Sequence, residues 1–249
     1  MSATTIEVAA ILFAATFVRS TFGFGEALIA VPLLALVMPV TVAAPVAALV
    51  SITVALIVVV QDWRHVQWRS AVRLVLATLF GIPLGLLLLT RAPEPVVKCV
   101  LGVIISLFAL YALRGGSGWH LAGDRAGWAF GLAAGVLGGA YGMNGPPLAV
   151  YGVMRRWSPQ EFRATLQGYF LPASALGMAG YWAVGLWTLS VNRLYLDSVP
   201  MVIAAIVLGR IANKRMSGPR FHAVIYMGLL IVGIVLVLQV VAFRPLTIL

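Results

Sequence analysis

The few charged residues of this chain separate ten apolar blocks, and this pattern constrains the fold more than any other feature. Hydrophobic residues make up 62% of the 249 residues and charged residues 10%, whereas soluble domains have roughly 45–50% and 25%. We therefore expect an all-α polytopic membrane protein, in which hydrocarbon replaces water as the solvent. The blocks cover approximately residues 6–18, 27–38, 40–61, 71–90, 95–113, 126–141, 146–154, 164–187, 197–213 and 220–243.

Two short apolar blocks stand out because each follows a glycine-rich segment. Blocks 27–38 and 146–154 fall below the roughly 20 residues that a crossing helix needs. Each follows a glycine-rich segment, RSTFGFGEA (19–27) in the first half and GGAYGMNGPP (138–147) in the second. We therefore expect a short broken or re-entrant helix pair at each place, and the sequence leaves both crossing and re-entry open.

The glycine-rich segments also mark an internal repeat. An offset of 119 aligns FGFGEALIAV (22–31) with YGMNGPPLAV (141–150). Further along, an offset of 124 aligns IPLG (82–85) with IVLG (206–209). These matches predict one membrane domain over residues 1–249, built from two tandem copies of the same five-block unit. Its parts are repeat one (1–114), a linker (115–125) and repeat two (126–249).

An odd number of blocks per repeat predicts that repeat two is inverted in the membrane. If loops 62–73, 114–125, 155–163 and 210–220 face the cytoplasm, they hold 12 of the 17 Lys and Arg residues, as the positive-inside rule requires. Both chain termini then lie outside the cell. This orientation accounts for the net charge of +10, and basic residues confined to short loops argue against nucleic-acid binding.

Inverted repeats with broken helices place a substrate site near the bilayer midplane, where the two breaks meet. Helices that begin after the breaks direct their positive N-terminal ends and amide N–H groups toward that place, which favours a small anion such as a carboxylate, sulfite or sulfonate. Close helix packing is the alternative role for any single glycine. The candidate binding residues are Ser20, Thr21, Gly23, Phe24 and Gly25 in the first break and Gly142, Met143, Asn144 and Gly145 in the second.

Ionisable residues flank the first break, and at membrane depth each charge costs roughly 2.5–3.5 kcal/mol. Glu26 is either a proton carrier coupled to anion movement or a helix-start carboxylate paired with Arg19. Arg19 contacts the anion, neutralises Glu26 or lies nearer an interface; we assign both residues to coupling or charge tuning. Gln167 is an isolated polar residue in an apolar block, where an interhelical hydrogen bond is the expected role.

Enzyme chemistry, metals and cofactors have no sequence signal. Cys99 is the one cysteine, and the three histidines lack metal-ligand spacing. No GxSxG nucleophile motif or nucleotide-binding loop is present. We therefore expect no catalytic residue, no metal site and no cofactor.

Three segments, TFGFGEALIAVPLLAL, GIPLGLLLL and GVLGGAYGMNGPPLAVYG, resemble the sulfite exporter TauE/SafE family, also called toluene sulfonate uptake permeases. The likeness covers nearly the whole chain, and its most specific parts are the two glycine-rich motifs. The resemblance implies a multi-pass transporter of the prokaryotic cytoplasmic membrane for sulfite, sulfonates or related organic anions, driven by an ion gradient.

We therefore expect a secondary transporter that moves a small anion by alternating access, surrounded by the lipid bilayer. H⁺ is the candidate coupling ion, and the exact substrate, import or export, and homo-oligomerisation stay open. An anion channel on the same scaffold is the alternative, because the sequence does not show that two gates never open together.

Overall fold

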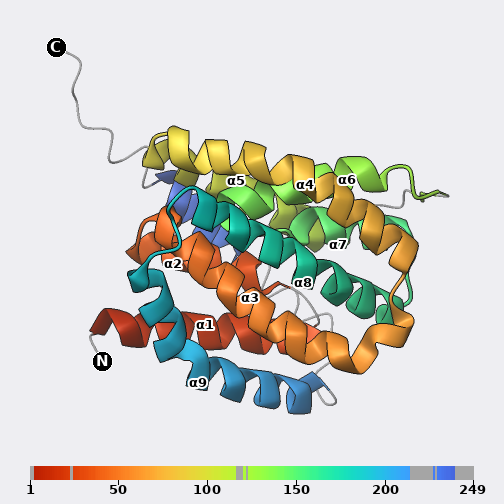
Figure 1. Ribbon diagram of the computed structural model, residues 1–249, viewed down its shortest axis with the longest axis horizontal. Helices are drawn as coiled ribbons and strands as arrows, with labels where there is room; N and C mark the ends of the chain where they lie inside the picture. Colours follow the sequence, from red (N-terminus) through yellow and green to blue (C-terminus); the bar gives the residue numbers. More distant parts are fainter. Residues whose placement is uncertain are drawn as a thin grey trace.

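The computed structural model describes residues 3–22, 25–115, 120–121, 123–213, 227 and 229–238. Within these residues every regular element is a helix (Figure 1), so the all-α fold class is confirmed. The elements are α1 (Ala3–Phe22), α2 (Glu26–Val37), α3 (Val40–Asp62), the 3-10 helix η1 (Trp63–His65), α4 (Trp68–Arg91), α5 (Glu94–Leu113), α6 (Gly127–Tyr141), α7 (Gly145–Met154), α8 (Pro159–Ala183), α9 (Leu189–Asn213) and a last apolar helix, Leu229–Leu238.

The start of α8 differs from its apolar block, because the helix begins at Pro159 instead of at residue 164. Ser158 and Glu161 form a capping box there. The Ser158 hydroxyl accepts a hydrogen bond from the Glu161 N–H at 3.3 Å, and the Glu161 carboxylate accepts one from the Ser158 N–H at 2.9 Å. Residues that cap a helix start are polar, so the helix begins before its apolar block does. The start of α9 at Leu189 likewise precedes its apolar block.

Several helices have the length and surface of membrane spans. Within the described residues, the stretches long and apolar enough to cross are Val40–Ile57, Trp68–Arg91, Glu94–Leu113 and Leu189–Ala212. Large apolar side chains also point outward; Phe80 is 69% exposed and Leu189 76%. In contrast, α2 has 12 residues and α7 has 10, about 18 and 15 Å at 1.5 Å per residue. Both are shorter than a hydrocarbon core of about 30 Å.

Long helix pairs form the two sides of the bundle, and the short helices lie against them. In Figure 1, α4 runs along α6 at one side and α1 runs along α9 at the other, while α3 and α8 cross the middle. The short α2 packs on α1 and α3, and the short α7 packs on α6. This arrangement brings the break between α1 and α2 and the break between α6 and α7 toward α3 and α8.

Glycines allow the backbones of α4 and α6 to touch. A Cβ atom added to Gly85 of α4 would lie 2.1 Å from the Val136 carbonyl oxygen, and one added to Gly135 of α6 would lie 2.6 Å from the Thr78 carbonyl oxygen. Such distances are inside van der Waals contact with main chain, which cannot rotate away. Small residues at helix interfaces are the usual means of close packing in membranes. The other glycines of this seam are Gly81, Gly131 and Gly139.

Alanine at Gly135 should therefore destabilise the protein by about 1–3 kcal/mol, the usual penalty for overpacking. The matched control is Gly177→Ala in α8, where no described atom lies within 4 Å of the added Cβ. Alanine favours a helix over glycine by about 0.5–1 kcal/mol, so this variant should be at least as stable as the wild type. Thermal unfolding in detergent measures the melting temperature of each variant. Equal melting temperatures for the two variants would contradict the close contact.

Asp124, in the segment between α5 and α6, fastens that segment to α4 and α7. Its Oδ1 accepts hydrogen bonds from Ser70 at 2.9 Å and from the Tyr151 hydroxyl at 3.1 Å, and it pairs with Arg155 at 3.1 Å. Partial burial opposes ionisation, but these hydrogen bonds and the positive charges of Arg155 and Arg73 outweigh it and hold the pKa of Asp124 below its usual range.

Because the pKa of Asp124 is lower in the folded state, the ionised carboxylate stabilises the fold above the ordinary Asp pKa of 3.8. That contribution is lost as the pH falls through the lower, folded-state value. Asp124→Asn should therefore lower the melting temperature at pH 7, and its difference from the wild type should shrink below pH 3.8. Asp197→Asn, at an exposed position, is the control. A difference that stays constant between these pH values would contradict this role of the charge.

Candidate functional site

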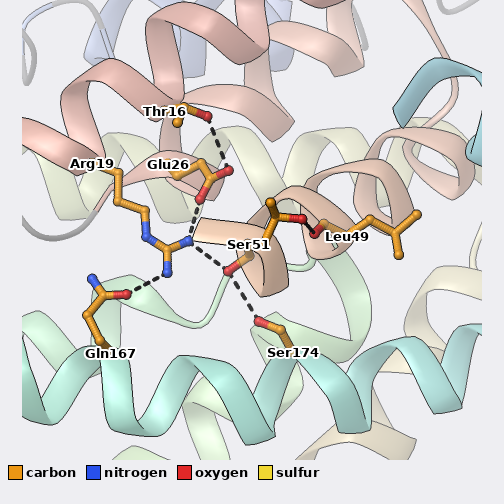
Figure 2. A network of polar contacts seen from close by, with 8 residues as sticks. Thr16, Arg19, Glu26, Leu49, Ser51, Gln167 and Ser174 are labelled. Atoms are coloured by element: carbon orange, nitrogen blue, oxygen red, sulfur yellow. Dashed lines mark hydrogen bonds and ion pairs between the residues drawn. The ribbon is translucent and has the colours of Figure 1, made fainter. Parts of the chain in front are cut away.

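The centre of the bundle contains a buried arginine bonded to three other helices (Figure 2). Arg19 of α1 is 3% exposed and forms an ion pair with Glu26 of α2, which is 2% exposed. The same Arg19 nitrogen, Nη1, donates to the Ser51 hydroxyl of α3 at 2.9 Å, and Nη2 donates to Gln167 Oε1 of α8 at 2.8 Å. One guanidinium therefore joins α1, α2, α3 and α8.

A second layer of contacts surrounds this arginine. Thr16 donates to Glu26 Oε1 at 3.5 Å, and Ser174 donates to the Ser51 hydroxyl at 3.2 Å. The Arg19 Cζ lies 5.1 Å from the centre of the Phe170 ring, within range of a cation–π interaction. Nε of Arg19 is buried and has no hydrogen-bond acceptor in the described part of the chain. A buried donor without an acceptor is unusual in a folded protein, so the guanidinium has a donor that none of the described residues uses.

Two helices begin beside this arginine. Gly25 precedes α2 with a left-handed φ of 99°, which allows the chain to turn sharply from α1. Asn144 and Gly145 begin α7, after Gly142 ends α6 with a left-handed φ of 63°. Neither α2 nor α7 has a side-chain hydrogen bond capping its N-terminus. The first N–H groups of a helix have no partner within that helix, and they carry partial positive charge.

Both breaks open on one small cavity of about 20 Å³. A cavity of this size has room for about one water molecule, so an anion as large as sulfite does not fit in this conformation. The cavity therefore joins the arginine to the two helix starts without leaving space for a ligand. Its lining consists of Arg19, Gly25, Glu26, Ala27, Leu28, Ser51, Gly142, Asn144, Gly145 and Phe170.

The structure brings together residues that the sequence places more than a hundred positions apart. Among those suggested by sequence, the ones at the cavity are Arg19, Gly25, Glu26, Gly142, Asn144 and Gly145. Arg19 and Glu26 form an ion pair, so neutralisation of Glu26 is the one of its suggested roles that is visible in this conformation. Asn144 also donates to the Tyr169 hydroxyl at 3.4 Å, which anchors the start of α7 to α8.

The other suggested residues lie elsewhere or outside the described residues. Thr21 donates to the carbonyl oxygens of Phe17 and Gly209 at 2.8 and 3.3 Å, so it connects α1 with α9. The Ser20 side chain packs against Gly209, and Met143 is fully buried in the apolar core. Neither lines the cavity. Gly23 and Phe24 lie outside the described residues.

Sequence reasoning missed Ser51 and Phe170 as members of the site. Serine in an apolar helix commonly bonds its own backbone, and phenylalanine is an ordinary core residue, so neither stands out. Gln167 did stand out as an isolated polar residue, and the expected interhelical hydrogen bond is confirmed by its contact with Arg19.

The guanidinium of this centre is a group that can hydrogen-bond an oxyanion. A guanidinium presents several donors in a plane and suits carboxylates and related oxyanions, which accept paired hydrogen bonds. Glu26 is itself such an oxyanion, and it occupies one side of Arg19. No group of three His, Cys, Asp or Glu side chains that could hold a metal ion is present among the described residues.

Known proteins match this chain along most of its length. The family model described as Sulfite exporter TauE/SafE matches residues 8–236. The protein named "Probable sulfite/organosulfonate exporter TauE" from Cupriavidus necator is 26% identical over 208 residues, which cover 81% of each chain. No solved structure matches the chain. Because the matching segment contains both helix breaks and the buried arginine with all its partners, the chain belongs to the sulfite exporter TauE/SafE family of multi-pass membrane transporters.

Proposed function

We propose that this chain is a secondary transporter that carries a small anion such as sulfite or a sulfonate across the prokaryotic cytoplasmic membrane by alternating access. The observation that carries the proposal is the buried Arg19 guanidinium beside the starts of α2 and α7. The relative from Cupriavidus necator is named as an exporter of sulfite and organosulfonates, which supports this substrate class.

The donors around the cavity suit an anion with several oxygen atoms. Arg19 supplies charge, Asn144 supplies an amide, and the starts of α2 and α7 supply backbone N–H groups. In a low-dielectric setting such fixed donors replace the water that an anion loses on entering. Since Pro146 and Pro147 have no N–H, Gly145 supplies the first amide of α7. Glu26 is the one acidic side chain among the described residues that line the cavity.

We infer that the domain consists of two inverted repeats, 1–114 and 126–249, and matched contacts support this. Gly85 of α4 meets the carbonyl of Val136 in α6, and Gly209 of α9 meets the carbonyl of Phe17 in α1. In the repeat alignment, Phe17 corresponds to Val136 at the offset of 119, and Gly85 corresponds to Gly209 at the offset of 124. Reciprocal contacts of this kind are what a two-fold axis between equivalent units produces.

A second observation supports an axis through the site. Ser51 and Ser174 lie 123 positions apart, within the range of the repeat offsets, and their hydroxyls are 3.2 Å apart. Equivalent residues touch each other only where they lie close to a two-fold axis. Since Ser51 also contacts Arg19, the anion site would lie where the two repeats meet, as in other transporters built from inverted repeats.

The contact between Arg19 and Glu26 suggests how transport is coupled to H⁺. Glu26 holds the position that an incoming anion would need, and the cavity has no space for both. Protonation removes the charge of Glu26 and releases Arg19, so one proton and one anion can occupy the site together once the helices move apart to admit the anion. The described groups that contact the Glu26 carboxylate are Arg19, which is charged, and Thr16, which is not.

The transporter is tested by counterflow in proteoliposomes loaded with sulfite, sulfate, thiosulfate, sulfoacetate, taurine or a simple carboxylate. Exchange of a labelled sulfur anion should saturate and should be stimulated by one class of loaded anion. A flux that follows the voltage without stimulation from the opposite side would contradict the carrier and favour a channel.

Loss of Arg19 should abolish this exchange. Arg19→Gln leaves Glu26 charged and unpaired, which should destabilise the fold by about 3–5 kcal/mol, whereas the double variant Arg19→Gln with Glu26→Gln leaves two neutral groups. We expect the double variant to fold and to exchange at less than one hundredth of the wild-type rate. Arg193→Gln, at an exposed site on α9, should exchange normally. Normal exchange by the folded double variant would remove Arg19 from the binding site.

Glu26→Gln alone tests the coupling. Glutamine cannot exchange a proton, so this variant should keep anion counterflow while a pH gradient no longer drives accumulation of the anion. Glu7→Gln, at an exposed position on α1, should respond to the gradient as the wild type does. Uptake under imposed pH gradients measures the difference, and an undiminished response in the Glu26 variant would rule Glu26 out as the proton carrier.

A further inference from the structure

A groove on the outer surface lies between the first turns of α4 and α6, apart from the central cavity. Its volume is about 440 Å³, and it is open to the surroundings. Trp68 is 53% exposed and Trp128 is 47% exposed. The residues lining the groove are Trp68, Arg69, Val72, Arg73 and Leu76 of α4 and Trp128 of α6. Cations, indole rings and aliphatic side chains therefore share one surface site.

The two arginines of the groove have guanidinium N–H groups that no other side chain in the described ranges accepts. Arg69 and Arg73 are one helical turn apart, and neither forms a hydrogen bond or ion pair with another side chain in the described ranges. Asp124 acts on Arg73 through space. That carboxylate, however, is already bonded to Arg155 and Ser70, as described above. Two guanidinium groups that line one groove suit a phosphate, which accepts several charge-assisted hydrogen bonds.

The apolar part of the groove continues along the membrane-facing side of α4. Val72 and Leu76 are 52% and 43% exposed, and Phe80, Leu84 and Leu87 extend the same exposed stripe at spacings of three or four residues. Side chains at these spacings lie on one face of a helix. A hydrocarbon chain that begins at Arg69 and Arg73 would therefore find an apolar path along α4.

The tryptophans indicate the depth of this groove in the bilayer. Trp68 is the first residue of α4 and Trp128 the second of α6. Tryptophan is enriched where hydrocarbon meets lipid headgroups, and phosphates of lipids lie at that level. Basic pockets between membrane helices are suited to anionic headgroups. A free phosphate ion would use the arginines but would leave the apolar stripe without a role.

We propose that the groove between α4 and α6 binds an anionic phospholipid, with its headgroup phosphate at Arg69 and Arg73 and one acyl chain along Val72 and Leu76. The positive charges of Arg69 and Arg73 favour an anionic headgroup. The exposed apolar stripe of α4 favours a lipid over a soluble phosphate. Because α4 and α6 form the glycine seam described above, the lipid contacts both helices of that pair.

Native mass spectrometry of the purified, delipidated full chain tests the proposal by titration with phosphatidylglycerol and, separately, phosphatidylcholine. The wild type should retain phosphatidylglycerol in preference to phosphatidylcholine. Arg69→Gln with Arg73→Gln should bind at least one phosphatidylglycerol fewer, or bind it at least tenfold more weakly. The matched control, Arg91→Gln with Arg193→Gln, removes the same charge from exposed positions elsewhere and should bind as the wild type does. Equal losses in both double variants, or equal retention of both lipids, would overturn the proposal.

Tryptophan fluorescence gives a second test that leaves the arginines intact. Brominated phosphatidylglycerol should quench the wild type saturably, and Trp68→Phe with Trp128→Phe should lose that quenching component. Quenching that is unchanged in this variant, or equal with brominated phosphatidylcholine, would overturn the proposal. Inorganic phosphate should not compete at concentrations comparable to the lipid; effective competition would assign the groove to phosphate alone and would also overturn it.

Discussion

The burial of one guanidinium charge is the constraint on which the centre of this structure depends. Arg19 lies deep among apolar helices, where an unpaired charge would be costly. It is tolerated because Glu26, Ser51 and Gln167 converge on it from three other helices. Convergence of this kind fixes how α1, α2, α3 and α8 meet. It also requires α1 to end before Glu26, since the carboxylate must turn back toward the arginine.

The bundle contains two kinds of helix contact, one between main chains and one between side chains. The glycine seam between α4 and α6 brings main chain against main chain and leaves no room for adjustment. The central contacts, in contrast, are made by side chains and by the ends of the short helices α2 and α7, around a cavity with room for one water molecule. Side-chain contacts can be exchanged for contacts with a ligand, whereas a backbone seam cannot. A rigid frame around an exchangeable centre is consistent with alternating access.

The sequence predicts most helices because so few charges interrupt it, and it predicts the helix breaks because glycine and proline gather there. Arg19 and Glu26 are conspicuous because ionisable residues are rare inside apolar blocks. Ser51 and Phe170 are not, because their role depends on how α3 and α8 cross α1, which no local pattern encodes. The start of α8 differs from its apolar block because polar capping residues begin the helix before that block starts. The inversion of the repeats stays a prediction, supported by the matched contacts.

The Ser51 hydroxyl carries one hydrogen and has two lone pairs. Arg19 and Ser174 both donate to this oxygen, so both lone pairs are engaged while its own hydrogen has no acceptor among the described residues. Ser51 lines the cavity, and anything that enters meets this hydroxyl as a donor. A negative ion can accept that hydrogen, but a positive ion finds no electron pair to coordinate. The two donors that Ser51 accepts thus leave this one hydroxyl able to donate a hydrogen bond but not to accept another in this conformation.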